Sequence, residues 1–463
     1  MSFPFFAVDS ASDGARFSAM HFSIQRLSFT AIFVIGVITL STTMSIRAFA
    51  NDAPLTLAQA QRQAVARSRQ LSAQNFAVAA SRDMAAAAGQ LADPVLKLGI
   101  DNLPVSGQDK LSLTRDFMTM RRIGVMQEIT RADKRQLRAE LYDRTAEKSQ
   151  AEKHAITATI ERDTAIAWLD LHYANAVALV IAEQKNQAQL EIDAADGAYH
   201  ANRGSQADVF AARTTYAQIE DRASENTRRI RSAKTMLARW IGEAAELPLA
   251  AVPAINTLGP HFVNSEQQIS RHPQIAVLKQ QQEIAVTQAK LALANKKSDW
   301  TVELAYQQRG PTYSNMLSIG LSIPFQFDQK NRQDRELSSR LAMVEQANAE
   351  SDEMLREHVA QTRTMLIEWQ NDQERVIRFE QELIPLAKQR IQATIAAYRG
   401  GKSSLSEVLG ARRNEIEIQL QSLQLQAETA RLWAQLKFLV PANNAEINQP
   451  EQHNAPTAKG SAQ

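Results

Sequence analysis

Cysteine is absent from this chain of 463 residues. The absence excludes disulfides, thiolate metal sites and a mature N-terminal cysteine that could carry a lipid. Turn-forming residues are scarce, with 16 Gly and 14 Pro, fewer than a compact α/β enzyme of this length needs. Ala, Gln, Glu, Arg and Leu dominate instead, and this composition favours long helices with a narrow apolar seam.

Neither sign of charge predominates, because 52 Lys and Arg stand against 50 Asp and Glu for a formal net charge of +2. The chain as a whole therefore has no field that would attract nucleic acid or an anionic membrane. Catalytic motifs are missing too, among them a phosphate-binding glycine loop, H-E-x-x-H and G-x-S-x-G. The 8 His have no spacing that places two on one helical face. We expect no enzyme activity, no cofactor, no resident metal and no nucleic-acid partner.

Long apolar runs are confined to the N-terminus. A basic residue precedes the apolar run Leu27–Leu40, and an A-x-A cleavage site follows before Asn51. Residues 1–50 are thus predicted to be a signal peptide region, with Met20 as an alternative start, and the mature protein is exported. An uncleaved anchor is the alternative, although the run is shorter than the ~20 residues that a span needs. No later segment has about 18 consecutive apolar residues, so any membrane crossing must use strands.

The chain also repeats itself. The pattern around Tyr199 recurs about 199 residues later around Tyr398, with basic, acidic and apolar residues at the same offsets. An earlier pair of segments also matches, because Ile123-Gly124-Val125 and Ile319-Gly320-Leu321 each lead into an Asp-containing polar stretch. Two tandem units of strands and very long helices predict an extended architecture.

Four strands are predicted, two in each unit, at residues 94–104, 122–129, 300–308 and 316–327. The third strand alternates most cleanly, with Trp300, Val302, Leu304 and Tyr306 on one face and polar residues on the other. This period suits a barrel wall that faces lipid outside and water inside. It suits an ordinary half-buried hairpin equally well.

The helices decide between these alternatives. Residues 134–199 contain no Pro and one Gly, and an unbroken helix of this length spans on the order of 100 Å. No globular core buries such a rod. A second long helix is predicted over residues 332–399 with a kink at Pro385, and shorter helices return over 206–240 and 404–439. Each unit also begins with a helix, near Leu57 and near Pro273.

The predicted domain organisation follows from these elements. A first repeat covers residues 51–247, a Pro-containing linker covers 248–260, and a second repeat covers 261–440. The polar tail, 441–463, is predicted to be disordered. Four strands cannot close a barrel, and open sheet edges are not tolerated in a bilayer, so strands that span a membrane require an oligomer.

From Leu55 to Val440 the chain resembles the TolC-like family of outer-membrane efflux proteins. The resemblance rests on the twofold repeat, on strand pairs that lead into long helices, and on the segments at residues 199–214 and 398–413. It implies a mainly α fold with a small β part: a homotrimer whose 12-stranded outer-membrane β-barrel is continuous with a periplasmic α-helical barrel. The stretches 203–213, 272–306 and 321–334 resemble the heavy-metal efflux branch.

The resemblance also implies a function and partners. Such a protein is the exit duct of a tripartite efflux system, located in the outer membrane and in contact with its lipid. Its partners are a periplasmic adaptor and an inner-membrane pump of the resistance-nodulation-division type, and heavy-metal cations are the expected substrates. A drug-efflux or type I secretion duct is the alternative within this fold. A periplasmic coiled-coil scaffold is the alternative from a different class, but it would not need the strand pairs.

By motif position, the resemblance places Asp208 and Glu407 at the periplasmic gate. In a trimer each becomes a ring of three carboxylates, whose mutual repulsion basic partners must offset. The other reading is that both are helix-start residues favoured by the helix dipole. Glycine at the turns is expected to supply positive φ. The predicted gate set is Asp208, Glu407, Arg213 and Arg412, and the predicted adaptor-contacting tips are Arg203, Gly204, Ser205, Gly400, Gly401 and Lys402.

Overall fold

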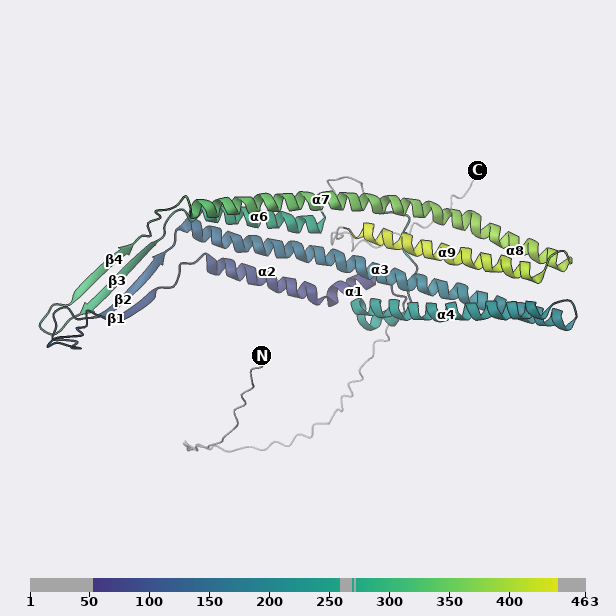
Figure 1. Cartoon of the computed structure of the whole chain (residues 1–463), viewed down its shortest axis with the longest axis horizontal. Coiled ribbons are helices and arrows are strands. Elements are labelled where there is room, and N and C mark those ends of the chain that lie inside the picture. Colours follow the sequence, from purple (N-terminus) through teal and green to yellow (C-terminus); the bar gives the residue numbers. More distant parts are fainter. Residues whose placement is uncertain (1–52, 259–268, 270–271, 440–463) are drawn as a thin grey trace, which may run out of the picture. The chain divides into compact units, whose positions relative to one another are not determined.

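The computed structural model describes residues 53–258, 269 and 272–439, all within one structural unit, Asp52–Gln463. The predicted signal peptide and C-terminal tail lie outside these residues. Within them the mainly α fold with a small β part is confirmed (Figure 1). The elements are α1 (Leu57–Arg67), α2 (Arg69–Ala88), β1 (Val95–Asp101), β2 (Met120–Ile129), α3 (Ala132–His200), α4 (Gln206–Ile241), a 3-10 turn (Gly242–Glu246), α6 (Pro273–Ala294), β3 (Trp300–Gln308), β4 (Met316–Ser322), α7 (Gln333–Arg378), a π turn (Phe379–Leu383), α8 (Ile384–Arg399) and α9 (Leu405–Lys437).

The helix α3 forms the centre of the helical part. It has 69 residues without a break and packs against α1, α2, α4, α6 and α9. Trp168 and Leu169 on α3 are fully buried in the main core, where Leu237 of α4 and Trp433 of α9 meet them. Part of α3 is long and apolar enough to cross a membrane by composition. Only 39% of this stretch is buried in the described chain, so the core covers part of it.

The segment predicted as a linker packs against this core over its described part, residues 248–258. Leu55 forms a parallel bridge with Leu249, and the indole N–H of Trp433 donates to the carbonyl of Thr257 at 2.9 Å. On the other side, the indole N–H of Trp168 donates to the carbonyl of Leu55 at 3.1 Å. This segment is therefore part of the core rather than a free tether.

A π turn stands where the sequence predicts a kink at Pro385. Proline lacks an N–H and clashes with the carbonyl four residues earlier in an α-helix. In the structure the N–H of Ile384 donates to the carbonyl of Phe379, which widens the turn just before the proline. The helical path from α7 to α8 thus continues through the proline.

The four strands form one antiparallel sheet in the order β1-β2-β3-β4. Its register aligns apolar residues into complete rows across all four strands, and this face is exposed within the described residues: Leu98 is 70% and Ile319 77% accessible. The two complete rows are Leu96, Val125, Leu304 and Ile319, and Leu98, Ile123, Tyr306 and Leu317.

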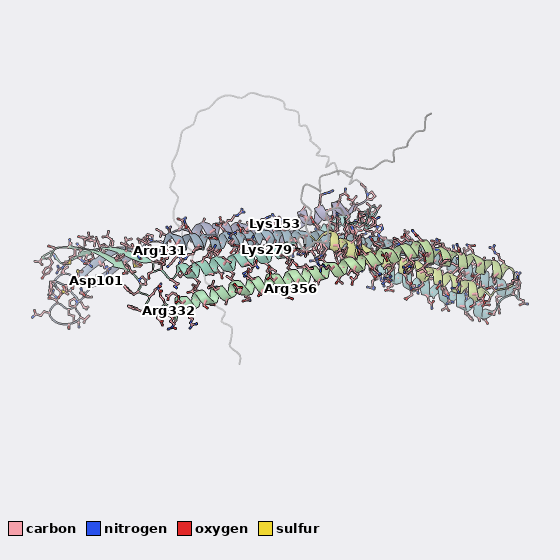
Figure 2. All side chains as sticks on the ribbon, turned by 90° about the horizontal axis from the view of Figure 1, so that it is seen from above. Asp101, Arg131, Lys153, Lys279, Arg332 and Arg356 are labelled. Atoms are coloured by element: carbon pink, nitrogen blue, oxygen red, sulfur yellow. The ribbon has the colours of Figure 1, made fainter. Side chains whose placement is uncertain are left out.

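The opposite face of the sheet is polar. Lys97 pairs with Glu303 at 2.8 Å, and Arg122 contacts both Glu303 and Asp101. Figure 2 labels Asp101 on the sheet and Arg131 and Arg332 where the strands give way to α3 and α7. The sheet thus has one charged face and one exposed apolar face.

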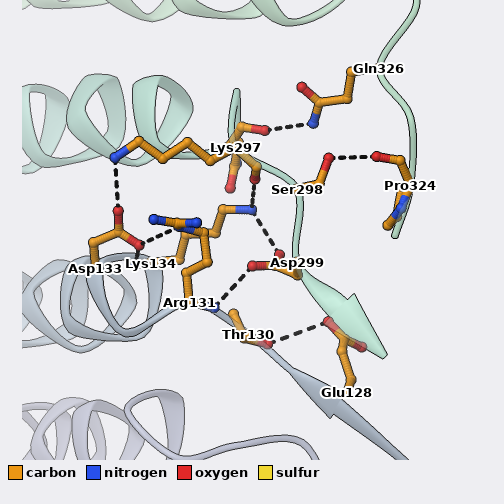
Figure 3. A network of polar contacts seen from close by, with 11 residues as sticks. Glu128, Thr130, Arg131, Asp133, Lys134, Lys297, Ser298, Asp299, Pro324 and Gln326 are labelled. Carbon is orange, nitrogen blue, oxygen red and sulfur yellow. Dashed lines mark hydrogen bonds and ion pairs between the residues drawn. The ribbon is translucent and has the colours of Figure 1, made fainter. Parts of the chain in front are cut away.

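A polar network joins the sheet to the helices (Figure 3). Lys134, only 4% exposed, donates to the Lys297 carbonyl at 2.5 Å and to the Asp299 carboxylate at 2.7 Å. The backbone N–H of Arg131 donates to the other oxygen of Asp299 at 3.0 Å. Lys297 in turn pairs with Asp133 at 3.3 Å. The start of α3 is therefore tied to the residues that lead into β3.

Lys134→Ala is expected to destabilise the protein by about 3 kcal/mol, because it leaves a partly buried carboxylate without its charge partner. Urea titration in detergent measures the change in the free energy of unfolding. Lys297→Ala is the matched control: it removes an exposed ion pair of the same network and should cost less than about 1 kcal/mol. Equal effects of the two variants would show that burial at Lys134 is not what stabilises the junction.

Candidate functional site

Both helical hairpins reverse direction through the same turn. The N–H of Arg203 donates to the carbonyl of Ala198, and the N–H of Lys402 to that of Ala397, each at 2.9 Å. These are six-to-one bonds that close a Schellman motif. The left-handed residue of this motif is Asn202 in the first hairpin (φ 53°) and Gly401 in the second (φ 69°). The two tips therefore have one backbone design.

The expected role of Gly204 in this turn is wrong. Its φ is not positive, and Asn202 adopts the left-handed conformation instead. Asn tolerates this region because its short polar side chain can bond locally. A Cβ on Gly204 would lie 3.1 Å from the Cβ of Ala198. Glycine at position 204 thus allows the turn to lie close to the end of α3 without crowding it.

Asp208 and Ser205 cap the start of α4 reciprocally. The hydroxyl of Ser205 accepts from the Asp208 N–H at 3.2 Å, and the Asp208 carboxylate accepts from the Ser205 N–H at 3.0 Å. The hydrogen bonds from the Ser205 backbone and side chain hold the pKa of Asp208 below its usual value. This is a capping box, and it keeps Asp208 ionised at the tip.

Glu407 occupies the equivalent position at the start of α9. Its N–H donates to the Ser404 hydroxyl at 3.3 Å, and its carboxylate accepts from the Ser403 hydroxyl. Val209, Leu409 and Ala195 belong to a small apolar cluster next to these caps. This cluster holds the first turns of α4 and α9 against α3 at the same end.

The predicted basic residues lie in two settings. Arg203 and Lys402 are exposed at the tips, whereas the two arginines reach back to α3. Arg213 pairs with Asp196 at 3.4 Å, and Arg412 lies 2.9 Å from Glu191. Across the described part of the chain, no ion pair joins these four residues to Asp208 or Glu407. Within the described chain the carboxylates predicted to form the gate are therefore capped by serines rather than neutralised by arginines.

Sequence reasoning missed Asp196 and Glu191, because helical periodicity does not show which distant helix a charge faces. It also missed a histidine contact: the rings of His272 and His358 lie 4.3 Å apart between α6 and α7. Burial is the main cause that lowers the pKa of His272 to about 4. Within the described ranges no group of three or more His, Cys, Asp or Glu could hold a metal ion. The pair thus lies in a helix contact as neutral rings.

No family model matches the chain, and no curated protein matches its sequence. Solved structures do match its fold. The outer-membrane channel OprN gives a TM-score of 0.70 at 15% identity over 83% of this chain and 90% of that one. The outer membrane protein VceC of Vibrio cholerae gives 0.67 at 18% identity over 83% and 95%. CusC, described for folding and transmembrane channel formation, gives 0.70 at 14% identity over 82% and 91%.

At these identities the likeness establishes the fold. The chain has the fold of these outer-membrane channel proteins, as its resemblance to the TolC-like family predicts. The likeness extends over at least 90% of each of these neighbours. The TM-score is 0.70 for both OprN and CusC, so the likeness does not distinguish between these two channels.

Ser205→Ala is expected to weaken the first turn of α4 by about 1 kcal/mol, because it removes the N-cap acceptor. Hydrogen exchange of the Asp208 amide, which donates to the Ser205 hydroxyl, should then be roughly fivefold faster. Thr214→Ala is the control, since the Thr214 hydroxyl bonds only the Phe210 carbonyl within the same helix. Unchanged exchange at Asp208 in Ser205→Ala would mean that the cap does not stabilise the tip.

Proposed function

We propose that the protein is the outer-membrane exit duct of a tripartite efflux system. In this proposal three copies form a twelve-stranded barrel in the outer membrane that continues into a periplasmic α-helical barrel. The observation that carries it is the exposed apolar face of a sheet whose other face is charged. The two tandem halves of the chain each contribute one strand pair and one helical hairpin.

The energetics of the sheet favour lipid as its surroundings. Rows of Leu, Ile, Val and Tyr side chains would leave a large apolar surface in water, at a cost of roughly 25 cal/mol per Å². The same face satisfies the requirement for a barrel wall in a bilayer, and the charged face then lines a water-filled interior. The strands β2 and β3, of 10 and 9 residues, match the roughly 9–11 residues of a membrane-spanning strand.

The unpaired edges of the sheet are the reason for proposing a trimer. Within the described residues the outer edges of β1 and β4 have no partner strand. Unpaired N–H and C=O groups in hydrocarbon cost several kcal/mol each, so an open edge must be closed by another strand. Pairing of β4 with β1 of the next copy closes a barrel of twelve strands when three copies are present.

The tips are proposed to dock a periplasmic adaptor, which connects the duct to an inner-membrane pump of the resistance-nodulation-division type. At about 1.5 Å per residue, α3 carries its tip about 100 Å from the sheet. Both tips present a basic side chain, Arg203 or Lys402, directly after the left-handed residue. Gly204, Ser205 and the pair Gly400-Gly401 complete the contact surface.

Asp208 and Glu407 are proposed to form the gate, each as a ring of three carboxylates around the threefold axis. Like charges in a constriction repel each other and attract cations. Arg213 and Arg412 hold the same helices against α3, so they set how closely the rings approach. Transport through this gate requires no bond chemistry.

Heavy-metal cations are the proposed substrates, on the resemblance of residues 203–213, 272–306 and 321–334 to the heavy-metal branch. A drug-efflux or type I secretion duct has the same fold and tips. The pump that copurifies with the channel separates these possibilities, because the duct alone does not choose the substrate. Recovery of a metal-exporting pump is the expected result.

Cysteine crosslinking tests the barrel, since the chain has no native cysteine. Gly99→Cys on β1 is combined in turn with Ser318→Cys, Gly320→Cys or Ser322→Cys on β4, which covers the possible registers. At least one pair is expected to give a covalent trimer on oxidation in outer membranes. Met126→Cys on the interior strand β2 replaces Gly99→Cys in the control. Only monomers in every combination would rule out closure by β1 and β4.

Single-channel recording in planar bilayers tests the gate. The combined variant Asp208→Ala and Glu407→Ala is expected to conduct more and to prefer cations less, because two carboxylate rings are lost. Glu225→Ala is the control, since its carboxylate pairs with Arg229 of its own helix at 2.7 Å. A conductance equal to that of the parent would mean that Asp208 and Glu407 do not form the constriction.

A further inference from the structure

A cavity that is partly open to solvent lies between the two helical hairpins, close to their tips. It has a volume of about 310 Å³ and is lined by residues of α3, α4, α8 and α9. Glu191 lies in its wall, nine residues before the end of α3, and so roughly 14 Å along the helix from the tip turn. Any change in how the hairpins pack around this cavity therefore acts close to the proposed gate.

Glu191 and Arg412 meet inside this cavity and connect the two hairpins. The Glu191 side chain is only 12% exposed, and its Oε1 lies 2.9 Å from Nε of Arg412. Neither atom makes a hydrogen bond within the described residues, because their alignment is poor. Arg412 instead donates from Nη1 to the Gln187 side chain at 3.2 Å. The carboxylate thus has a nearby cation but little hydrogen bonding.

The rest of the lining is largely polar, with Gln187, Gln392 and Gln419 among its residues, but none of these side chains hydrogen-bonds the Glu191 carboxylate in the described chain. Gln184 is 93% buried, by its 7% accessibility, and its amide nitrogen has no partner among the described residues. From α4 the lining contains only Thr215 and Ile219. The charged groups that line the cavity besides Glu191 are Glu183 of α3, Lys388 of α8, and Arg412, Arg413 and Glu415 of α9.

Burial has the larger effect on Glu191. It raises the pKa of the carboxyl to about 7, against the opposing attraction of Arg412 and Arg413. Burial also raises the pKa of Glu415, with Lys388 and Arg412 opposing and Glu183 adding to the rise. Burial thus favours the protonated form of Glu191 and of Glu415 more than water does.

We propose that Glu191, Arg412 and the cavity around them act as a proton-sensitive joint between the two hairpins. The joint tightens when Glu191 takes up a proton and loosens when Glu191 loses it. The consequence for the gate rests on the proposed duct function: acid in the periplasm would hold the tips together, and neutral to alkaline conditions would favour their separation.

The direction of the pH dependence follows from the linkage between protonation of Glu191 and packing of the hairpins. The packed hairpins hold Glu191 with a pKa of about 7, whereas a solvated glutamate has 4.5. The packed arrangement is therefore stabilised in full below pH 4.5, and this contribution is lost as the pH rises to about 7. For one carboxylate, the ratio of loose to packed hairpins rises by up to about 30-fold between about pH 5.5 and about pH 8.5. A simple ion pair between Glu191 and Arg412 would give the opposite trend, with acid breaking the contact.

Spin labels placed on the two hairpins test the joint directly. Ala194→Cys on α3 and Asn414→Cys on α9 are exposed positions, and the chain has no other cysteine. The labelled full chain is diluted with unlabelled chain in detergent, and distances between the two labels are measured at about pH 5.5 and about pH 8.5. The distribution is expected to be narrow in acid and to gain a second, longer component in alkali.

Glu191→Gln mimics the protonated side chain at nearly the same volume, and should give the narrow distribution at both pH values. Glu220→Gln is the matched control, because Glu220 also joins two helices through a cation, Lys185 at 2.8 Å, but on the exposed surface between α3 and α4. This control should retain the pH response of the parent. A parent that shows no pH response, a response that survives in Glu191→Gln, or broadening in acid would each overturn the joint.

The same preparation tests the proposed joint and the proposed duct function independently. A trimer that conducts but shows no pH-dependent distance leaves the duct proposal intact and removes the joint. A pH-dependent distance in a chain that does not conduct leaves the joint intact and removes only its link with gating.

Discussion

The structure depends on one constraint: a helix of 69 residues satisfies its own backbone hydrogen bonds but cannot bury its own side chains. Every other helix of the described chain packs against α3 directly, or through one helix that does. Trp168 shows the result most clearly, because α1, α4 and α9 all contribute to the core around it. The apolar face of the sheet is not part of this core, which is why it needs other surroundings.

The contacts of Lys134 connect the helical part of the chain to the sheet. Only Thr130 and Arg131 separate β2 from α3, so the side-chain period changes from two to 3.6 within two residues. Lys134 meets the Asp299 carboxylate there, at the start of β3, which pairs with β2. The same residues therefore fix where the two strand pairs join and where the helical part begins.

Much of this fold could be predicted from the sequence, because its elements are long and its patterns strong. The predicted helix 134–199 is α3 to within two residues, and the predicted strand 300–308 is β3. Periodicity shows which face of a helix is apolar but not which neighbour covers it. The packing of residues 248–258 and the partners of Arg213 and Arg412 depend on contacts between distant segments, so they appear only in the structure. The choice of Asn202 over Gly204 as the left-handed residue was equally hidden, since both types suit a turn.

Equivalent residues of the two halves come to differ because α3 lies between α4 and α9. Arg213 and Arg412 occupy the same offset from their tips, and both reach α3, since it contacts both return helices. They meet different parts of α3: Arg213 pairs with Asp196, whose side chain is 37% exposed, and Arg412 with Glu191, whose side chain is only 12% exposed. An ion pair that is open to water contributes little to stability. The free energy of a carboxylate shielded from water, in contrast, depends strongly on whether it carries a proton. A chain that repeats its sequence pattern thus acquires one solvent-accessible ion pair that contributes little to stability and one contact that is sensitive to protons.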